Sequence, residues 1–286
     1  MDNGEIFEIE IINKKNNQII GLINDEKILV TAKDLDSLSI GKKYFGFVYL
    51  NRHNEWRATL NFPRTSLRSF GKASVVSVDH ESGVFVNIGL VDKDILVSLD
   101  DLPDQKQDWP KEGDELIIRL QQDRKNRLWG KLATDEDLIN GGFVNNDSKL
   151  KRNQMVSGSI YHLGKNGSFI LLNEERLAYL YHTETNDRVH LGQKVVGRVI
   201  GFGKHNRINI SLLKNAYARI DDDSAMILAA IKYNPQKALK VTDKSSPEEI
   251  KNLFGISKSS FKRAVGHLLK TKTIVEEDGY LKLKIK

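Results

Sequence analysis

One strand-turn-strand pattern occurs three times in this chain of 286 residues, and the copies are separated by about the length of a small β-barrel. Each copy opens a strand at a turn glycine, and an asparagine follows 13 or 14 residues later. The opening glycines are Gly41, Gly113 and Gly192, and the asparagines are Asn54, Asn126 and Asn206. A unit repeated at this spacing indicates a tandem array rather than one large domain.

The repetition extends upstream of each ending. Residues 28–35 reappear as residues 95–102 and, more loosely, as residues 179–184. A glycine-bounded apolar strand precedes these segments at Gly83 and Gly167, whereas the first copy has no aromatic residue in the corresponding strand. Short β-branched runs separated by Gly, Asn and Asp predict small antiparallel barrels.

The last part of the chain loses the β-repeat and becomes helical. Residues 221–224 supply carboxylates and a hydroxyl that predict the start of one helix. Ser246, followed by Pro247 and Glu249, forms a capping box with proline at the first helical position. The turn at residues 255–257 then joins two helices into a helix-turn-helix, and a closing hairpin follows. This order predicts a winged helix.

The predicted architecture is therefore mainly β with a C-terminal α+β domain. Three tandem barrels precede a winged helix-turn-helix. The predicted boundaries are 1–62 for a divergent first repeat, 70–132 for the second, 151–213 for the third and 221–286 for the winged helix.

Polar residues mark the solvent face of the second helix in the helix-turn-helix. A recognition helix presents such side chains to a nucleic-acid groove or to phosphates. The candidates are Lys258, Ser259, Lys262, Arg263 and Lys270. In the following hairpin, lysines alternate with apolar residues, and the alternative interpretation is that these lysines protect an edge strand from pairing.

Charge is distributed unevenly along the chain, whose formal net charge is +6. Residues 1–150 sum to −5, residues 151–213 to +5 and residues 224–286 to +7. A basic half is the electrostatic signature of a nucleic-acid binder, because neutralised phosphates release counterions. A solvated lysine-rich surface is the alternative interpretation.

The sequence offers no catalytic motif. The acidic clusters at residues 100–101, 135–137 and 221–223 lie where turns or helix starts use carboxylates, so we expect no metal site. The seven histidines lack zinc-ligand spacing, and no phosphate loop or nucleophile elbow occurs. We therefore expect a non-enzyme without a cofactor. The chain has no cysteine and no membrane-spanning segment, so we expect a cytoplasmic protein without disulfides or a membrane partner.

The three repeats resemble the RNA-binding OB repeat of the large ribosomal protein S-one. Together with the winged helix they resemble the bacterial conserved virulence factor B family across essentially the whole chain. The segments that carry this resemblance are 97–102, 109–114, 199–202, 244–251 and 254–258. It implies three five-stranded OB barrels and a cytoplasmic RNA-binding regulator of virulence-factor expression, without an intrinsic active site.

The resemblance also implies RNA-binding positions in the second and third repeats. OB repeats stack bases on aromatic side chains while basic groups hold phosphates. In the second repeat these positions are Phe85, Asp123 and Arg127. In the third they are Phe169, Tyr181 and Arg207, and a larger surface adds Tyr161, His162, His182, Lys204 and His205. The alternatives are that the phenylalanines are core residues and that Arg127 and Arg207 only pair with local carboxylates.

The first repeat departs from the OB-repeat pattern. It has Thr31, Asn51 and Glu55 at the corresponding positions, so we expect it to serve as structure or as a protein contact. The tryptophans Trp56, Trp109 and Trp129 are interpreted as packing residues.

Three functions follow from these features. The first is a regulator that binds single-stranded RNA through the third repeat and the winged helix. The second is a transcription regulator that binds duplex DNA through Lys258, Lys262 and Arg263. The third is a scaffold whose acidic repeats 1 and 2 dock a protein partner, such as a ribonuclease or a ribosome component.

Overall fold

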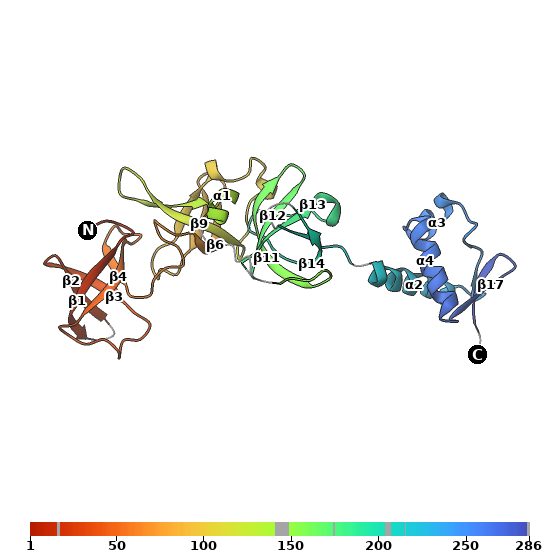
Figure 1. Ribbon diagram of the computed structural model, residues 1–286, viewed down its shortest axis with the longest axis horizontal. Helices are drawn as coiled ribbons and strands as arrows, with labels where there is room; N and C mark the ends of the chain where they lie inside the picture. Colours follow the sequence, from red (N-terminus) through yellow and green to blue (C-terminus); the bar gives the residue numbers. More distant parts are fainter. Residues whose placement is uncertain (16–17, 141–148, 174, 204–206, 215, 285–286) are drawn as a thin grey trace. The chain divides into compact units, whose positions relative to one another are not determined.

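Short β-branched strands with glycine and asparagine turns form three closed five-stranded barrels (Figure 1). The computed structural model describes residues 1–15, 18–140, 149–173, 175–203, 207–214 and 216–284. Barrel 1 contains β1 (Ile6–Lys15), β2 (Gln18–Ile23), β3 (Glu26–Thr31), β4 (Lys43–Leu50) and β5 (Trp56–Thr59). Barrel 2 contains β6 (Gly71–Asp79), β7 (Gly83–Asn87), β8 (Ile95–Ser98), β9 (Glu115–Gln122) and β10 (Leu128–Leu132). Barrel 3 contains β11 (Met155–Gly164), β12 (Gly167–Leu172), β13 (Leu177–Tyr181), β14 (Lys194–Phe202) and β15 (Ile208–Ser211).

The three barrels share one topology. In each, the third strand pairs in parallel with the fifth, and the other pairings are antiparallel. The first strand of each barrel also has a β-bulge, between Ile11 and Asn13, Val75 and Ser77, and Ile160 and His162. Such a bulge bends a long strand so that it can pair with both of its neighbours and close the barrel. The prediction of three tandem five-stranded barrels is confirmed.

Two glycines allow close contact between adjacent strands. A Cβ at Gly83, whose φ is +132°, would lie 2.1 Å from the carbonyl oxygen of Val97. A Cβ at Gly167 would lie 2.3 Å from the carbonyl oxygen of Leu180. Both glycines open the second strand of their barrel. A side chain at either position would collide with the neighbouring strand, which explains why the sequence has glycine there.

The barrels are joined by shared cores. Phe47 and Tyr49 of barrel 1 are buried in the cluster that forms the core of barrel 2. A second cluster between barrels 2 and 3 contains Phe70, Tyr161 and Leu171. Backbone hydrogen bonds cross this second joint, from the Glu115 N–H to the Gly192 carbonyl at 3.0 Å and from the Leu191 N–H to the Asp108 carbonyl at 3.0 Å.

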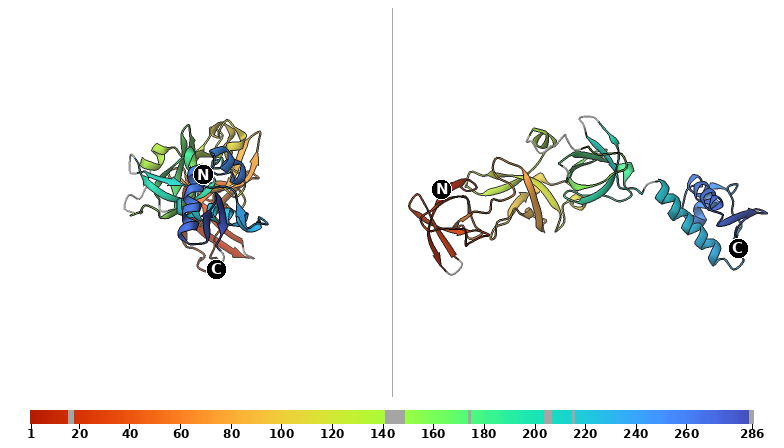
Figure 2. Two further views of the ribbon diagram at one scale, coloured as in Figure 1. Left: turned by 90° about the vertical axis from the view of Figure 1, so that its right-hand side faces the viewer. Right: turned by 60° about the horizontal axis from the view of Figure 1, so that its bottom comes forward.

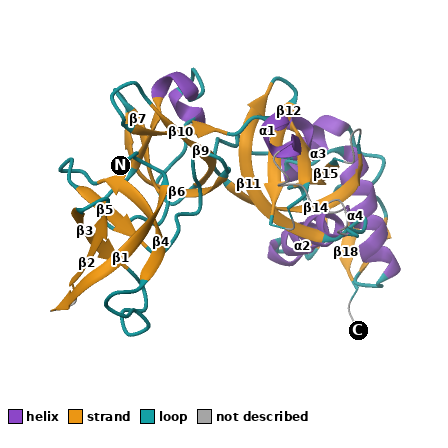
Figure 3. Cartoon of the chain, turned by 60° about the vertical axis from the view of Figure 1, so that its left-hand side comes forward, coloured by secondary structure: helices purple, strands orange, loops and turns teal. Residues whose placement is uncertain are grey.

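Most of the helical structure lies in the last part of the chain (Figure 3). The chain divides into two compact units, residues 1–212 and 213–286. The second unit contains α2 (Ala216–Tyr233), β16 (Ala238–Leu239), α3 (Pro247–Phe254), α4 (Lys258–Lys270), β17 (Ile274–Glu277) and β18 (Tyr280–Leu283) (Figure 2). Its strands form a three-stranded sheet in the order β16-β18-β17. The predicted winged helix is confirmed, with β16 as an additional short strand.

The capping residues predicted for the helix-turn-helix are in place. The Ser246 side chain accepts a hydrogen bond from the Glu249 N–H at 3.1 Å. Gly255 ends α3 with φ at 68°, and the Ser257 side chain caps α4. The buried face of α4 contributes Phe261 and Leu268 to the core of this unit.

The predicted start of the first of these helices is wrong, because α2 begins at Ala216 and residues 221–224 lie inside it. Partners stabilise these polar side chains within the helix. Lys214 Nζ lies 2.6 Å from a carboxylate oxygen of Asp222, and the Ser224 hydroxyl donates to the Ala264 carbonyl on α4 at 3.2 Å. Among the described helices, none has the length and apolar character needed to cross a bilayer.

Candidate nucleic-acid interface

Outward-facing side chains of barrel 3 form a row of rings across three strands. The strand register pairs His162 on β11 with Phe169 on β12, and Phe169 with Tyr179 on β13. The ring centroids are 5.3 Å apart for His162 and Phe169, and 5.0 Å apart for Phe169 and Tyr179. Tyr181, 44% exposed, extends the row through an edge contact of 4.8 Å with Tyr179. We call His162, Phe169, Tyr179 and Tyr181 the barrel-3 aromatic row.

Arg207 lies beside this row. Its guanidinium carbon is 4.9 Å from the centre of the Phe169 ring, which is within cation–π range. Arg207 Nη2 donates to a carboxylate oxygen of Asp135 at 2.5 Å, and Nη1 donates to the Tyr161 hydroxyl at 3.4 Å. Asp135 begins α1 (Asp135–Asn140), so the segment after barrel 2 holds Arg207 against the aromatic row.

The pairing of Arg207 limits what it can do. Its side chain is only 12% exposed and its charge is paired with Asp135. Arg207 therefore adds a stacking surface to the row rather than a free cation. Tyr161, which the sequence placed on the RNA surface, is 3% exposed and donates its hydroxyl to Asp135. Its ring packs between barrels 2 and 3 and its hydroxyl is bonded to Asp135, so it offers little surface on which a base could stack.

Asp135 makes this arrangement sensitive to acid. Burial opposes its ionisation, but hydrogen bonds from Arg207 and Tyr161 outweigh that effect and lower the pKa of the carboxyl. Because the lower pKa belongs to the folded state, the carboxylate contributes stability that is present above the ordinary pKa of about 4. This contribution is lost as the pH falls through the folded-state pKa.

We therefore expect Asp135→Asn to lower the melting temperature at neutral pH, and the difference from the unmodified chain to shrink as the pH falls below about 4. Thermal melts of both proteins across this range test the prediction. A difference that stays constant with pH would contradict it.

The remaining candidates in barrel 3 lie around the row. His182 is exposed at the end of β13, with its Nε2 3.1 Å from the Lys165 carbonyl oxygen. Lys204 and His205 lie outside the residues that the structure describes.

Barrel 2 presents a smaller version of the same surface. The strand register places Phe85, Leu96 and Trp129 side by side across β7, β8 and β10. The guanidinium carbon of Arg127 is 5.3 Å from the Trp129 ring centre, and the Arg127 side chain is 60% exposed. The pKa of Asp123 is lowered to about 2, mainly by a hydrogen bond from the Arg127 backbone N–H and further by one from the Arg127 side chain. This surface therefore contains two aromatic rings and one stacked arginine.

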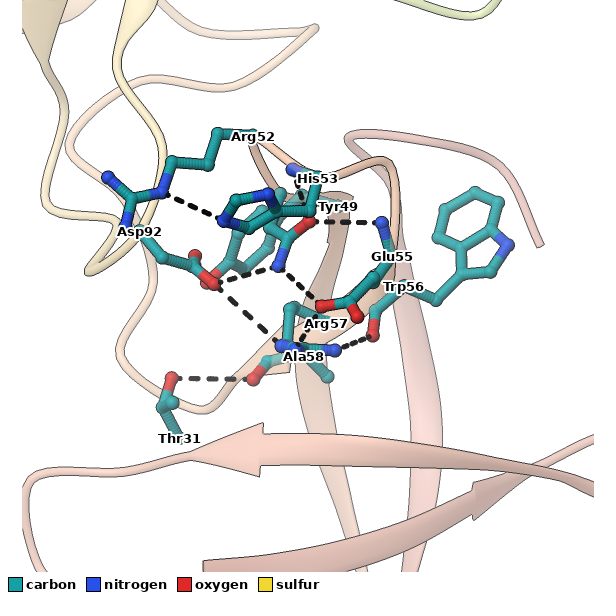
Figure 4. Close-up of polar contacts among 10 residues, drawn as sticks. Thr31, Tyr49, Arg52, His53, Glu55, Trp56, Arg57, Ala58 and Asp92 are labelled. Atoms are coloured by element: carbon teal, nitrogen blue, oxygen red, sulfur yellow. Dashed lines mark hydrogen bonds and ion pairs between the residues drawn. The ribbon is translucent and has the colours of Figure 1, made fainter.

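The corresponding corner of barrel 1 contacts barrel 2 instead (Figure 4). The Tyr49 hydroxyl donates to Asp92 of barrel 2 at 2.8 Å, and the Asn51 amide donates to the same carboxylate at 3.3 Å. Arg57 Nε lies 3.7 Å from a carboxylate oxygen of Asp92, and Arg57 Nη2 lies 2.5 Å from a carboxylate oxygen of Glu55. Asn51 is 3% exposed, and its side-chain oxygen Oδ1 orders the β4–β5 turn by accepting hydrogen bonds from the backbone N–H groups of His53 and Glu55. Of the divergent residues of repeat 1, Asn51 thus bonds directly to barrel 2, and Glu55 pairs with Asn51 and Arg57 beside this joint.

The winged-helix candidates share the solvent side of α4. Lys262 and Arg263 are exposed, as are Ser259 and Lys270, whereas Lys258 is half-buried. Lys262 Nζ lies 3.7 Å from a carboxylate oxygen of Asp243, and the Arg263 guanidinium donates to the Ser260 hydroxyl at 3.3 Å. Both cations remain accessible to an anionic ligand.

The structure adds residues that the sequence analysis missed or assigned to another role. Tyr179 lies at the centre of the aromatic row, and its position two residues before Tyr181 on one strand is the signal that could have identified it. Asp135 was interpreted only as a helix-start carboxylate, and Trp129 only as a packing residue. Asp135 contacts Tyr161 and Arg207, and Trp129 pairs with Leu96, so both placements depend on residues far away in the chain.

Comparisons with known families match three parts of the chain. Residues 70–131 match the model described as the CvfB first S1-like domain. Residues 142–214 match the second domain of the virulence regulatory factor CvfB, and residues 225–283 match the CvfB-like winged helix domain. The matched segments follow the order of barrel 2, barrel 3 and the winged helix.

Individual relatives match over nearly the whole length. Conserved virulence factor B of Staphylococcus epidermidis RP62A is 37% identical over 266 residues, covering 91% of this chain and 87% of the relative. The protein of the same name in Staphylococcus aureus N315 is 36% identical over 264 residues, covering 91% and 86%. A crystal structure of a multidomain protein with nucleic acid binding domains from Streptococcus pneumoniae TIGR4 is 33% identical, with a TM-score of 0.69, and covers 99% of this chain and 98% of that one.

Proposed function

The chain belongs to the conserved virulence factor B family, and from this premise we propose that it regulates gene expression by binding single-stranded RNA. The family models describe a virulence regulatory factor, so the proposed targets are transcripts that affect virulence-factor production. No catalytic step is assigned to it. Its proposed place of action is the cytoplasm.

The barrel-3 aromatic row is the observation that carries this proposal. Bases of a single strand stack on aromatic side chains of OB strands, and every base has a face that can stack. The row offers four rings, and Arg207 is held beside them by Asp135. The related pneumococcal protein, whose structure is described as having nucleic acid binding domains, gives further support.

The winged helix supplies the electrostatic part. Residues 224–286 carry a net charge of +7, and the exposed face of α4 presents Lys262 and Arg263. A second weak module on the same chain raises the effective concentration at the first, so overall affinity increases without any new contact. Barrel 3 and the winged helix would therefore act on one RNA.

The test is fluorescence anisotropy of the full chain against single-stranded RNA, single-stranded DNA and duplex DNA of matched sequence, at two salt concentrations. We expect tightest binding to single-stranded RNA. Preference for duplex DNA would shift the function to the winged helix, whose α4 has the exposed polar face of a recognition helix. Binding to none of them, together with a protein partner retained after nuclease treatment, would favour the scaffold.

Charge reversal on α4 tests the contribution of the winged helix. In the variant Lys262→Glu, Arg263→Glu, we expect weaker RNA binding and a salt slope that is flatter by about 1.4, because each lost phosphate contact contributes about 0.7 for single strands. The matched control is Lys232→Glu, Lys240→Glu, which makes the same change in charge at exposed positions outside α4. Equal slopes in the two variants would remove α4 from the RNA surface.

A further inference from the structure

A groove of about 550 Å³ lies between barrels 2 and 3. Its lining includes Leu102, Lys131 and Leu132 from barrel 2, and His162, Leu163 and Phe169 from barrel 3. His162 and Phe169 also belong to the barrel-3 aromatic row, so the groove begins where that row ends.

The walls of the groove are held in place before any ligand binds. Besides the two backbone hydrogen bonds between the barrels, Arg188 of barrel 3 lies 2.7 Å from the Asp108 carboxylate of barrel 2. His190 Nε2 is 2.8 Å from Asp114, and the Ser159 hydroxyl donates to Glu115 at 3.1 Å. A cleft with fixed walls loses little conformational entropy when a ligand enters.

The chemistry of the lining selects the type of ligand. Leucine side chains and the Phe169 ring make most of the surface apolar, with a few polar groups at fixed positions, as in sites for small aromatic ligands. The volume is within the range of about 300 to 1,000 Å³ that is typical of such sites.

The charged groups of the groove determine the orientation of that ligand. Asp101 and Asp135 also line it, and their carboxylates oppose entry of a phosphate. Lys131, whose side chain is 44% exposed, pairs with Asp101 and provides a cation. A base can therefore enter the apolar part while its phosphate stays outside, near Lys131.

We propose that this groove takes one base of the same RNA strand that crosses the barrel-3 aromatic row. The proposal rests on the proposed function, and it assigns barrels 2 and 3 to one continuous RNA path. Lys131 contacts the phosphate of the inserted nucleotide, and the leucines with Phe169 enclose the base.

The test measures the affinity of the full chain for single-stranded RNAs of about 16 nucleotides, each with one abasic nucleotide at a different position. For the unmodified protein, we expect one abasic position to weaken binding about fivefold or more. The loss at this position should be the same when Tyr181 is replaced by Ala. In Leu132→Trp, which fills the groove, the same position should no longer matter. If Leu132→Trp binds every RNA as the unmodified protein does, the proposal is wrong.

Lys131→Glu provides a second test that leaves the leucines intact, with Lys111→Glu as the control for an exposed lysine of barrel 2 outside the groove. We expect Lys131→Glu alone to weaken binding, by about threefold or more for a lost phosphate contact. Equal affinities of the two variants would overturn the proposal that the groove binds a base, whereas the proposed function would stand. Failure of the unmodified protein to bind any RNA would overturn both.

Discussion

Loss of aromatic surface in barrel 3 is expected to weaken RNA binding by about 1 to 3 kcal/mol for each base that no longer stacks. We expect this result for Tyr181→Ala, because Tyr181 is 44% exposed and ends the aromatic row. Phe169→Leu should have a similar effect, since it keeps apolar volume in the barrel but removes the ring against His162, Tyr179 and Arg207. Anisotropy titrations with one single-stranded RNA measure both effects.

Two controls separate recognition from folding in this experiment. Tyr181→Phe retains the ring and should bind as the unmodified protein does. Thermal melts should show that Tyr181→Ala folds normally, because an exposed side chain contributes little to the core. Normal folding with unchanged affinity in both Tyr181→Ala and Phe169→Leu would show that the row does not bind RNA.

The largest effect on stability is expected for Phe261→Ala in the winged helix. Phe261 is fully buried, and its ring stacks against Phe254 with centroids 5.5 Å apart. Removing a buried phenylalanine side chain costs about 3 to 5 kcal/mol, a large fraction of the stability of a small domain. Hydrogen exchange followed by mass spectrometry should show loss of protection in α2, α3 and α4.

The barrels should keep their protection in this variant, because residues 1–212 form a compact unit of their own. Leu253→Ala is the control, since Leu253 on α3 is 57% exposed and its truncation should change stability by about 0.5 kcal/mol or less. Loss of protection throughout barrels 1 to 3 would contradict the division into two units. With the winged helix unfolded, the remaining RNA affinity measures what the barrels contribute.

The parts of the fold that depend on local chemistry could be predicted from the sequence. Asn54 and Asn126 adopt φ of 60° in the turns of their hairpins, as asparagine does more readily than most residues. Ser246 and Gly255 cap α3 as their sequence context indicated. These features depend on a few neighbouring residues, so a short stretch of sequence contains most of the information.

The parts that were missed depend on distant partners. Asp135 and Arg207 are 72 residues apart in the chain, and only the packing of α1 beside barrel 3 brings them together. The position of Trp129 in an outward row depends on pairing with Leu96. The start of α2 was misplaced because carboxylates such as those at residues 221–223 are common at helix starts, whereas here Asp222 lies inside the helix and pairs with Lys214, which precedes it.

The barrel-3 aromatic row is the central claim of this account, and photo-crosslinking tests it most directly. The full chain would be crosslinked to a single-stranded RNA that contains thiouridine, and the modified peptides identified by mass spectrometry. The account predicts crosslinks at His162, Phe169, Tyr179 or Tyr181, which are lost when excess unlabelled RNA competes. Crosslinks confined to barrel 1, with none in barrel 3, would contradict it.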